Sequence, residues 1–365
     1  MREFDLKDTE KLLAGLTVLG TGGGGEAEWG RILLRHEVEH GRPIRVVDPQ
    51  EVEDDAFVCS GGIMGSVKSL DDVSFEDITE EWETMFPLVE AIKLMEKLQG
   101  KQVNYLIPFE AGGLNTPVVM AAAARLGIPV IDADGNGRST PETQMISFIG
   151  FGIDLYPMPL VDRYGNTSVV VHGNNTTYAD EVGRFIVVKG GGLGANAHYG
   201  MTGQQVKAAL VPGAISKSIK IGEILENSDS EQRYDALLDI LKAKKLFEGK
   251  VDFIESVNKG GFYLTELTLK NEETSDTAKV VIKNETMAMW VNGELKAILP
   301  DHIYMIDPVT HQGVPSVELE MNKEVRFLGA PCHERVKKAF RTPKGQEAFG
   351  PARFGYPDLP YKELD

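Results

Sequence analysis

The first 135 residues alternate between short apolar runs and amphipathic segments. Between the runs, apolar side chains recur at helical spacing, as Trp29, Ile32, Leu33 and Val38 do ahead of Gly41. This pattern predicts helices over residues 5–14, 26–40, 86–98 and 117–126. It predicts buried strands over residues 16–20, 44–47, 56–60, 105–108 and 129–132. Strands that alternate with helices indicate right-handed crossovers, so we expect an α/β fold with a mostly parallel sheet and flanking helices.

The second half of the chain follows a different pattern. Residues 160–190 are rich in strand formers, and residues 201–244 predict two or three helices. From Lys250, short apolar runs separated by turn residues predict a β-rich module, in which Asn292-Gly293 is a strong hairpin signal. We therefore predict an N-terminal α/β domain over residues 1–168 and a C-terminal region over residues 169–365. That region should comprise helices packed on the first domain (201–244), a smaller β-rich module (246–335) and a surface arm (341–365).

Composition excludes several classes of protein. The chain has 55 acidic and 38 basic side chains among 365 residues, a formal charge of −17 that would repel nucleic-acid phosphates. No apolar run reaches the roughly 18 residues of a membrane span, and the acidic N-terminus is unlike a signal peptide. The two cysteines, Cys59 and Cys332, are too few for a disulfide framework. We expect a cytoplasmic homo-oligomer that acts on a small molecule and binds neither nucleic acid nor membrane.

A run of glycines ends the first expected strand. Residues 20–25 formally satisfy the dinucleotide fingerprint, and Asp48 ends the next strand where a ribose-binding acid would stand. An NAD-dependent oxidoreductase is therefore one alternative. Glu26 and Glu28 count against it, because both would face a pyrophosphate in the first helical turn. The loop could instead cradle any small ligand through the backbone of Gly22, Gly23 and Gly24.

Three further glycine-containing segments follow expected strands: residues 61–65, 110–115 and 132–138. The carboxyl ends of parallel strands share one edge of the sheet, where open α/β folds place their ligands. We therefore expect these segments to meet residues 20–25 around one crevice. The substrate-binding candidates that they contribute are Gly62, Met64, Asn115 and Arg138.

Four acidic residues lie in or beside these segments: Glu110, Asp132, Asp134 and Glu142. Hydrolysis needs a base and an acid, and two carboxyl groups in unequal environments can divide these roles. Arg138 could hold a substrate carboxylate, and Asn115 could bind a ring amide. His198, in the glycine-dense segment 190–203, is the histidine that we place nearest to substrate. The sequence leaves open which carboxyl group is the base, and each one could also serve as a helix cap or turn residue.

Two short sequences resemble metal motifs. His36-Glu37-Val38-Glu39-His40 spells the zincin motif, but its helix runs away from the glycine segments, so we expect no zinc there. The sequence from Asp132 to Gly137 opens like a calcium loop, yet Thr143 occupies its closing position. We assign no cofactor. A divalent metal ion held by Asp132 and Asp134 stays open.

Several of these motifs occur together in one protein family. Leu-Gly-Thr-Gly-Gly-Gly-Gly (19–25), Gly-Gly-Ile-Met-Gly (61–65), Glu-Ala-Gly-Gly-Leu-Asn (110–115) and Asp-Ala-Asp-Gly-Asn-Gly-Arg-Ser-Thr-Pro-Glu (132–142) stand in order at matching separations. Further matches follow at residues 201–203, 214–216 and 299–307. Over nearly its whole length, the chain therefore resembles the DUF917 family, also called S-methyl thiohydantoin desulfurase, often encoded beside hydantoinase- or oxoprolinase-like genes.

This resemblance implies an α/β N-terminal domain joined to a smaller β-rich domain. It also implies hydrolytic loss of methanethiol from a 2-methylthio imidazolone ring, which leaves a hydantoin. The leading hypothesis is therefore a hydrolase that acts on a five-membered cyclic amide or thioimidate. No catalytic residue is carried over from the family. A non-catalytic subunit that partners a hydantoinase or oxoprolinase is a further alternative.

Overall fold

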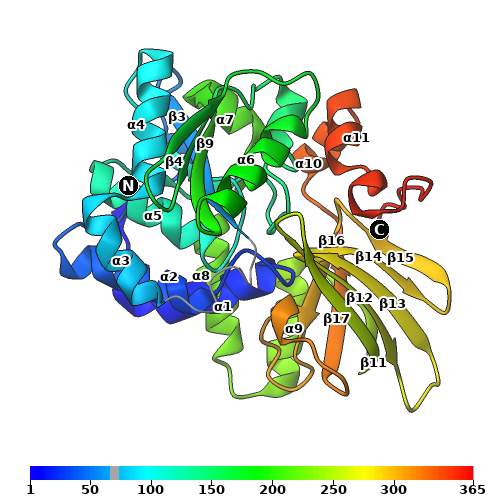
Figure 1. Cartoon of the computed structure of the whole chain (residues 1–365). Coiled ribbons are helices and arrows are strands. Elements are labelled where there is room, and N and C mark those ends of the chain that lie inside the picture. Colours follow the sequence, from blue (N-terminus) through cyan, green and yellow to red (C-terminus); the bar gives the residue numbers. More distant parts are fainter. Residues whose placement is uncertain (66–73, 365) are drawn as a thin grey trace.

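The chain folds around two sheets that lie side by side (Figure 1). The computed structural model describes residues 1–65 and 74–364. No helix within these residues combines the length and the apolar character needed to cross a membrane. The first sheet is surrounded by helices, whereas the second is a curled antiparallel sheet whose edge strands approach each other.

The N-terminal sheet contains eight strands of mixed direction. In spatial order they are β1 (Arg2–Glu3), β2 (Arg45–Val47), β5 (Val130–Ile131), β4 (Tyr105–Pro108), β3 (Phe57–Gly65), β9 (Leu193–Thr202), β7 (Met158–Asp162) and β8 (Thr167–Val170). Strands β2, β5, β4 and β3 are parallel, and the remaining pairs are antiparallel. The expected α/β class is confirmed. We expected the site at the carboxyl ends of the parallel strands, which are β2, β5, β4 and β3.

Helices cover both faces of this sheet. The helices of the first 200 residues are α1 (Thr9–Leu19), α2 (Ala27–Glu39), α3 (Phe75–Thr84), α4 (Pro87–Gln99), α5 (Asn115–Leu126) and α6 (Tyr178–Lys189). Beyond β9 follow α7 (Gly203–Ala209), α8 (Ala214–Leu225) and α9 (Ser230–Leu241). Helix α8 packs on α1 so closely that the Cβ of an alanine at Gly15 would lie 2.0 Å from the Ser218 carbonyl oxygen.

The strand expected over residues 16–20 is wrong, because these residues form the last turns of α1. Leu12, Leu13, Leu16 and Leu19 are buried along one helical stripe, so the apolar run is the buried face of a helix. In a short apolar run, periodicity alone cannot distinguish a buried segment of a helix from a buried strand. As a result, the glycine run follows a helix, and the dinucleotide fingerprint lacks the strand that it requires.

Three other segments differ from expectation. Residues 61–65 continue β3 instead of leaving it as a loop, and residues 193–202 form β9 instead of a loop. The segment expected to be strand-rich contains β7 and β8, but its second half is helix α6. In β3 and β9 the glycines lie where a neighbouring backbone or side chain packs closely against the strand. A Cβ at Gly61 would lie 2.7 Å from the carbonyl oxygen of Asn196.

The C-terminal sheet is antiparallel and contains β15 (Glu294–Ile298), β14 (Glu285–Val291), β13 (Thr277–Lys283), β12 (Phe262–Lys270), β11 (Lys244–Lys259), β17 (Glu324–Ala330) and β16 (His302–Ile306). The expected hairpin at Asn292-Gly293 is confirmed, and both residues have positive φ. The chain then forms α10 (Glu334–Phe340), α11 (Pro343–Phe349) and η5 (Pro351–Phe354), and Phe349 is fully buried.

Short elements complete the chain. They are η1 (Leu6–Asp8), η2 (Pro49–Glu51), η3 (Ser147–Phe151), η4 (Ser316–Glu318) and the small ladder of β6 (Ala133–Asp134) with β10 (Val211–Pro212). Arg138, fully buried between the sheets, donates hydrogen bonds to the carbonyl oxygens of Thr286 (2.9 Å) and Asp301 (3.3 Å). These bonds tie the segment after β6 to the C-terminal sheet.

The C-terminal end of α2 carries a buried ion-pair network. Glu37 has no exposed surface, and its carboxylate accepts hydrogen bonds from Arg42 (2.5 Å) and Arg125 (2.8 Å). Glu83 of α3 forms ion pairs with both arginines and a hydrogen bond with Nε2 of His36 (2.8 Å). Because the carboxylates are neutralised by arginine, this network joins α2, α3 and α5 as a structural cluster.

We expect Glu37→Gln to lower the free energy of unfolding by about 3 kcal/mol, because it removes one partner of a buried charge network. Urea denaturation followed by circular dichroism measures this change. Glu39→Gln is the matched control, since Glu39 lies on the same helix but is exposed, and it should change stability by less than about 0.5 kcal/mol. Equal stability of the two variants would contradict a structural role for the network.

Candidate active site

A cavity of about 520 Å³ lies between the two sheets. Its walls come from the glycine loop after α1, the end of β3, the segment after β4, residues 140–143, helix α6 and the turn between β13 and β14. Of the residues that we expected to meet substrate, those that line it are Gly22, Gly23, Gly24, Met64, Glu110, Asn115 and Glu142. The glycine loop and the carboxyl ends of β3 and β4 thus meet as the sequence predicted.

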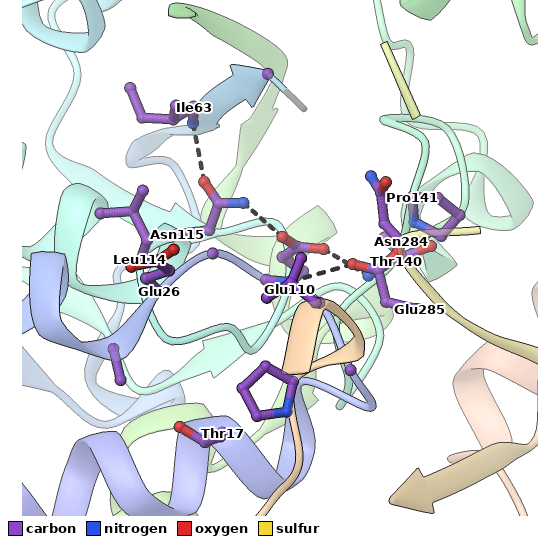
Figure 2. A pocket seen from close by; sticks show the side chains of 18 of the residues that line it. Thr17, Glu26, Ile63, Glu110, Leu114, Asn115, Thr140, Pro141, Asn284 and Glu285 are labelled. Atoms are coloured by element: carbon purple, nitrogen blue, oxygen red, sulfur yellow. Dashed lines mark hydrogen bonds between the residues drawn. The ribbon is translucent and has the colours of Figure 1, made fainter. Parts of the chain in front are cut away.

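Glu110 follows β4 directly and is held in place by two donors. Asn115, in the first turn of α5, donates from Nδ2 to Glu110 Oε1 at 2.6 Å and accepts at Oδ1 from the Ile63 amide at 3.0 Å. The Thr140 amide donates to Glu110 Oε2 at 2.5 Å. Figure 2 shows Asn115 between the Ile63 backbone and Glu110. Because both groups of its amide are engaged, Asn115 orients Glu110.

A second carboxyl group reaches the cavity from the C-terminal sheet. Glu285 begins β14, directly after Asn284, which has a φ of +60°. Its Oε1 accepts hydrogen bonds from the Gly24 amide (3.2 Å) and the Ser139 hydroxyl (2.9 Å). Its Oε2 is buried and has no hydrogen-bond partner among the described residues. Figure 2 shows Glu285 approaching Glu110 from the side opposite Asn115.

Burial raises the pKa of both carboxyl groups. Removal from water raises the pKa of Glu110 to about 7, against the opposing effect of its donors Thr140 and Asn115. Removal from water and the nearby charge of Glu110 together raise the pKa of Glu285 to about 8. Interacting carboxyl groups lose their protons in steps that belong to the pair. Near neutral pH the pair can therefore hold one proton, which suits it to both donate and accept protons.

The glycine loop allows this approach of the two domains. The Cβ of an alanine at Gly23 would lie 2.0 Å from Glu285 Oε1, and one at Gly24 would lie 2.5 Å from the Gly112 Cα atom. Gly22, Gly24 and Gly25 also have positive φ, which residues with side chains rarely adopt. The glycines are therefore required for the backbone and for the packing of Glu285, a role that does not need a nucleotide.

Glu142 lies on the cavity wall in a different electrostatic setting. Its carboxylate accepts hydrogen bonds from Lys283 (2.5 Å) and from Arg353 Nε (3.1 Å). Gln144 donates a further bond at 2.7 Å. Through these contacts with two cations, Glu142 joins the cavity wall to β13 and η5.

Two of the expected carboxylates do not line the cavity. Asp132 accepts hydrogen bonds from the amides of Ile215 (2.8 Å) and Ser216 (3.0 Å), so it caps α8. Asp134 accepts from the amides of Asn136 (2.6 Å) and Gly137 (2.5 Å) within its own turn. These carboxyl groups hold different parts of the backbone, and neither lines the cavity.

Arg138, Gly62 and His198 also lie outside the cavity lining. Arg138 binds backbone carbonyl oxygens, as described above. Gly62 lies within β3, and a Cβ there would be 2.5 Å from the Phe109 ring. His198 lies within β9, fully buried, with the Phe109 ring edge-on at 5.6 Å between centroids. Burial lowers the pKa of His198 to about 3, which keeps the imidazole uncharged.

Sequence reasoning missed four residues that shape the site: Ser139, Thr140, Arg184 and Glu285. Thr140 and Ser139 are adjacent to Arg138 and belong to the motif that was recognised. Glu285 has no such signal, because Lys283-Asn284-Glu285 reads as a polar turn between two apolar strands. Nothing in its local spacing indicates that this turn reaches the first domain.

The described residues contain one cluster of three metal-type side chains: His36, Glu37 and Glu83. It lies outside the cavity lining, and the arginines of the α2 network already neutralise its carboxylates. His40, the other histidine of the zincin-like sequence, stacks on His36 and bonds at Nδ1 to the His36 carbonyl oxygen. Through these contacts, the two histidines and two glutamates belong to the structural network at the end of α2.

The sequence and the fold were compared with those of known proteins. A family model described as "S-Me-THD-like, N-terminal domain" matches residues 7–172, and one described as "S-Me-THD-like, C-terminal domain" matches residues 174–364. A search of curated proteins gave no match. The crystal structure of a protein from Chromobacterium violaceum matches with a TM-score of 0.77 and 23% identity, covering 100% of both chains, which shows a common fold. The two family models together span nearly the whole chain, which therefore belongs to the S-Me-THD-like family, the S-methyl thiohydantoin desulfurase family (DUF917).

Proposed function

We propose that the chain is a hydrolase that removes methanethiol from an S-methyl thiohydantoin or a closely related cyclic thioimidate. Water adds to C2 of the ring, and the C2–S bond breaks. The water oxygen becomes the carbonyl oxygen of the hydantoin, one proton of water goes to the ring nitrogen, and the other goes to the departing methanethiolate. Membership of the S-Me-THD-like family supports this reaction class.

The observation that carries the mechanism is the buried pair of Glu110 and Glu285 at the cavity. Glu110 acts as the base, because the two donors on its carboxylate stabilise the charged form. Glu285 acts as the acid, because its Oε2 lies in a dry environment that favours the protonated form. The Ser139 hydroxyl donates a hydrogen bond to Glu285 and lies near both groups.

The dimensions of the cavity fit this substrate class. A volume of about 520 Å³ lies within the usual range for small-molecule sites and accommodates a five-membered ring with a substituent. The lining also includes Glu26, Glu28 and Glu318 near the glycine loop. This acidic surround favours an uncharged ring over a dinucleotide, whose pyrophosphate it would repel.

We expect Glu110→Gln and Glu285→Gln each to reduce kcat by about 10²–10⁴-fold, the usual contribution of a positioned acid or base. The measurement is release of methanethiol from a synthetic S-methyl thiohydantoin, followed with a thiol reagent. Glu37→Gln is the control, because it removes a buried carboxylate outside the cavity and should retain turnover below its melting temperature. No methanethiol from the wild-type chain would favour the alternative of a non-catalytic partner subunit, and full activity of both variants would contradict the assigned roles.

The proposed roles also predict a bell-shaped dependence of kcat/KM on pH. Activity should rise as the pair loses its first proton and fall as it loses its second, because burial raises the pKa of both carboxyl groups, that of Glu110 to about 7 and that of Glu285 to about 8. The optimum should therefore lie in a narrow interval near neutral pH. In Glu110→Gln, loss of the neighbouring charge should lower the pKa of Glu285, which carboxyl-selective infrared difference spectra can follow. A profile that is flat across neutral pH would contradict the paired titration.

A further inference from the structure

Exposed apolar side chains are concentrated on one part of the N-terminal domain. Eleven large apolar side chains are exposed among the described residues, and five of them lie between residues 164 and 188. We name the surface that they form the β8–α6 surface; its members are Tyr164, Val171, Tyr178, Phe185 and Val188. Exposed apolar side chains that occur singly are ordinary, but a concentration of this kind marks an interaction surface.

These residues are adjacent in space as well as in sequence. On α6, Tyr178, Phe185 and Val188 project from neighbouring positions of one helical face, because seven residues make nearly two turns. Tyr164, ahead of β8, packs against the backbone at Gly191, beyond the end of α6. Val171, after β8, is joined through Gly173 to the start of the helix, where a Cβ at Gly173 would lie 3.0 Å from that of Tyr178. Strand β8 and the exposed face of α6 thus border one surface.

Strand β8 gives this surface an unpaired sheet edge. Within the part of the chain that the structure describes, β8 pairs with β7 on one side and with no strand on the other. Its sequence is Thr-Ser-Val-Val, without a charged residue or a proline. The opposite edge strand, β1, is two residues long and carries Arg2 and Glu3. In the C-terminal sheet, the edge strands β15 and β16 lie against each other. An uncharged exposed edge presents free backbone groups on which another strand can pair.

The local charge is compatible with pairing between identical chains. Between residues 164 and 190, Asp180 and Glu181 are balanced by Arg184 and Lys189, so two acids minus two bases give no net charge. The whole chain has a formal charge of −17. Two copies that meet at this surface therefore bring together no excess of charge of one sign.

We propose that a second copy of this chain binds the β8–α6 surface across a two-fold axis, with β8 antiparallel to the β8 of its partner. Two antiparallel strands of identical sequence satisfy each other's free backbone groups, as an isologous interface requires. The exposed faces of the two α6 helices then cover each other's apolar side chains. This assembly follows from the edge strand and its charge, and it does not depend on the proposed reaction.

Sedimentation equilibrium with the full-length chain tests the proposal. The wild-type protein should have twice the chain mass of 40.0 kDa. Val171→Glu and Phe185→Glu place a carboxylate in the interface and should shift the mass to that of one chain. Val309→Glu is the matched control, because Val309 and Val171 are both 71% exposed and Val309 lies outside the surface; this variant should keep the wild-type mass. Circular dichroism verifies that each variant is folded.

Cysteine cross-linking tests the strand pairing directly. Ser168 and Val169 lie in the middle of β8, close to the proposed axis, so Ser168→Cys or Val169→Cys should form a disulfide-linked dimer on oxidation. The native Cys59 and Cys332 are buried, and Val309→Cys serves as the exposed control that should stay uncoupled. A wild-type chain that is monomeric at about 100 µM overturns the proposal. A dimer that survives both glutamate variants and cross-links at neither β8 position also overturns it.

Discussion

The structure depends on the burial of two carboxyl groups from different domains at one junction. Glu110 comes from the end of a parallel strand in the first domain, and Glu285 comes from a turn in the second. Neither group keeps its ordinary pKa, because each has left water and Glu285 also experiences the charge of Glu110. Such a pair costs stability unless nearby groups compensate it. The residues around the pair provide this compensation.

The compensation has a steric and an electrostatic part. Because Gly23 and Gly24 have no Cβ atoms, Glu285 can contact the glycine loop and the second domain can approach closely. Arg138, fully buried between the sheets, provides a positive charge near both carboxyl groups and lowers the pKa that each would otherwise have. Burial in turn lowers the pKa of Arg138 to about 10. Its hydrogen bonds go to carbonyl oxygens, so its charge remains available to the pair.

The sequence predicted the class of fold and half of the site, for identifiable reasons. The end of β3 and Glu110, after β4, lie at the cavity because the carboxyl ends of parallel strands share an edge. The error at residues 16–20 arose because a helix that is buried on one side presents the same short apolar run as a strand. Asp132 and Asp134 belong to a recognised motif, but they bond to backbone amides, and only three-dimensional contacts distinguish such caps from ligands. Glu285 could not be found, since its role depends on the way the two domains pack.

The distribution of cations explains why these two carboxyl groups, among several in the cavity, are suited to proton transfer. Glu142 is bound directly by Lys283 and Arg353, and it serves as part of the cavity wall. Arg184 is likewise engaged, by Asp180 at 2.9 Å and by backbone oxygens, and its helix α6 holds that side of the cavity. Glu110 and Glu285 have neutral donors instead, and Arg138 acts on them without a hydrogen bond to either. A carboxylate bound by a cation gains no proton near neutral pH, whereas one that meets neutral donors in a dry setting can do so. The placement of four cations thus separates the acids held in structural contacts from the pair to which we assign the proposed chemistry.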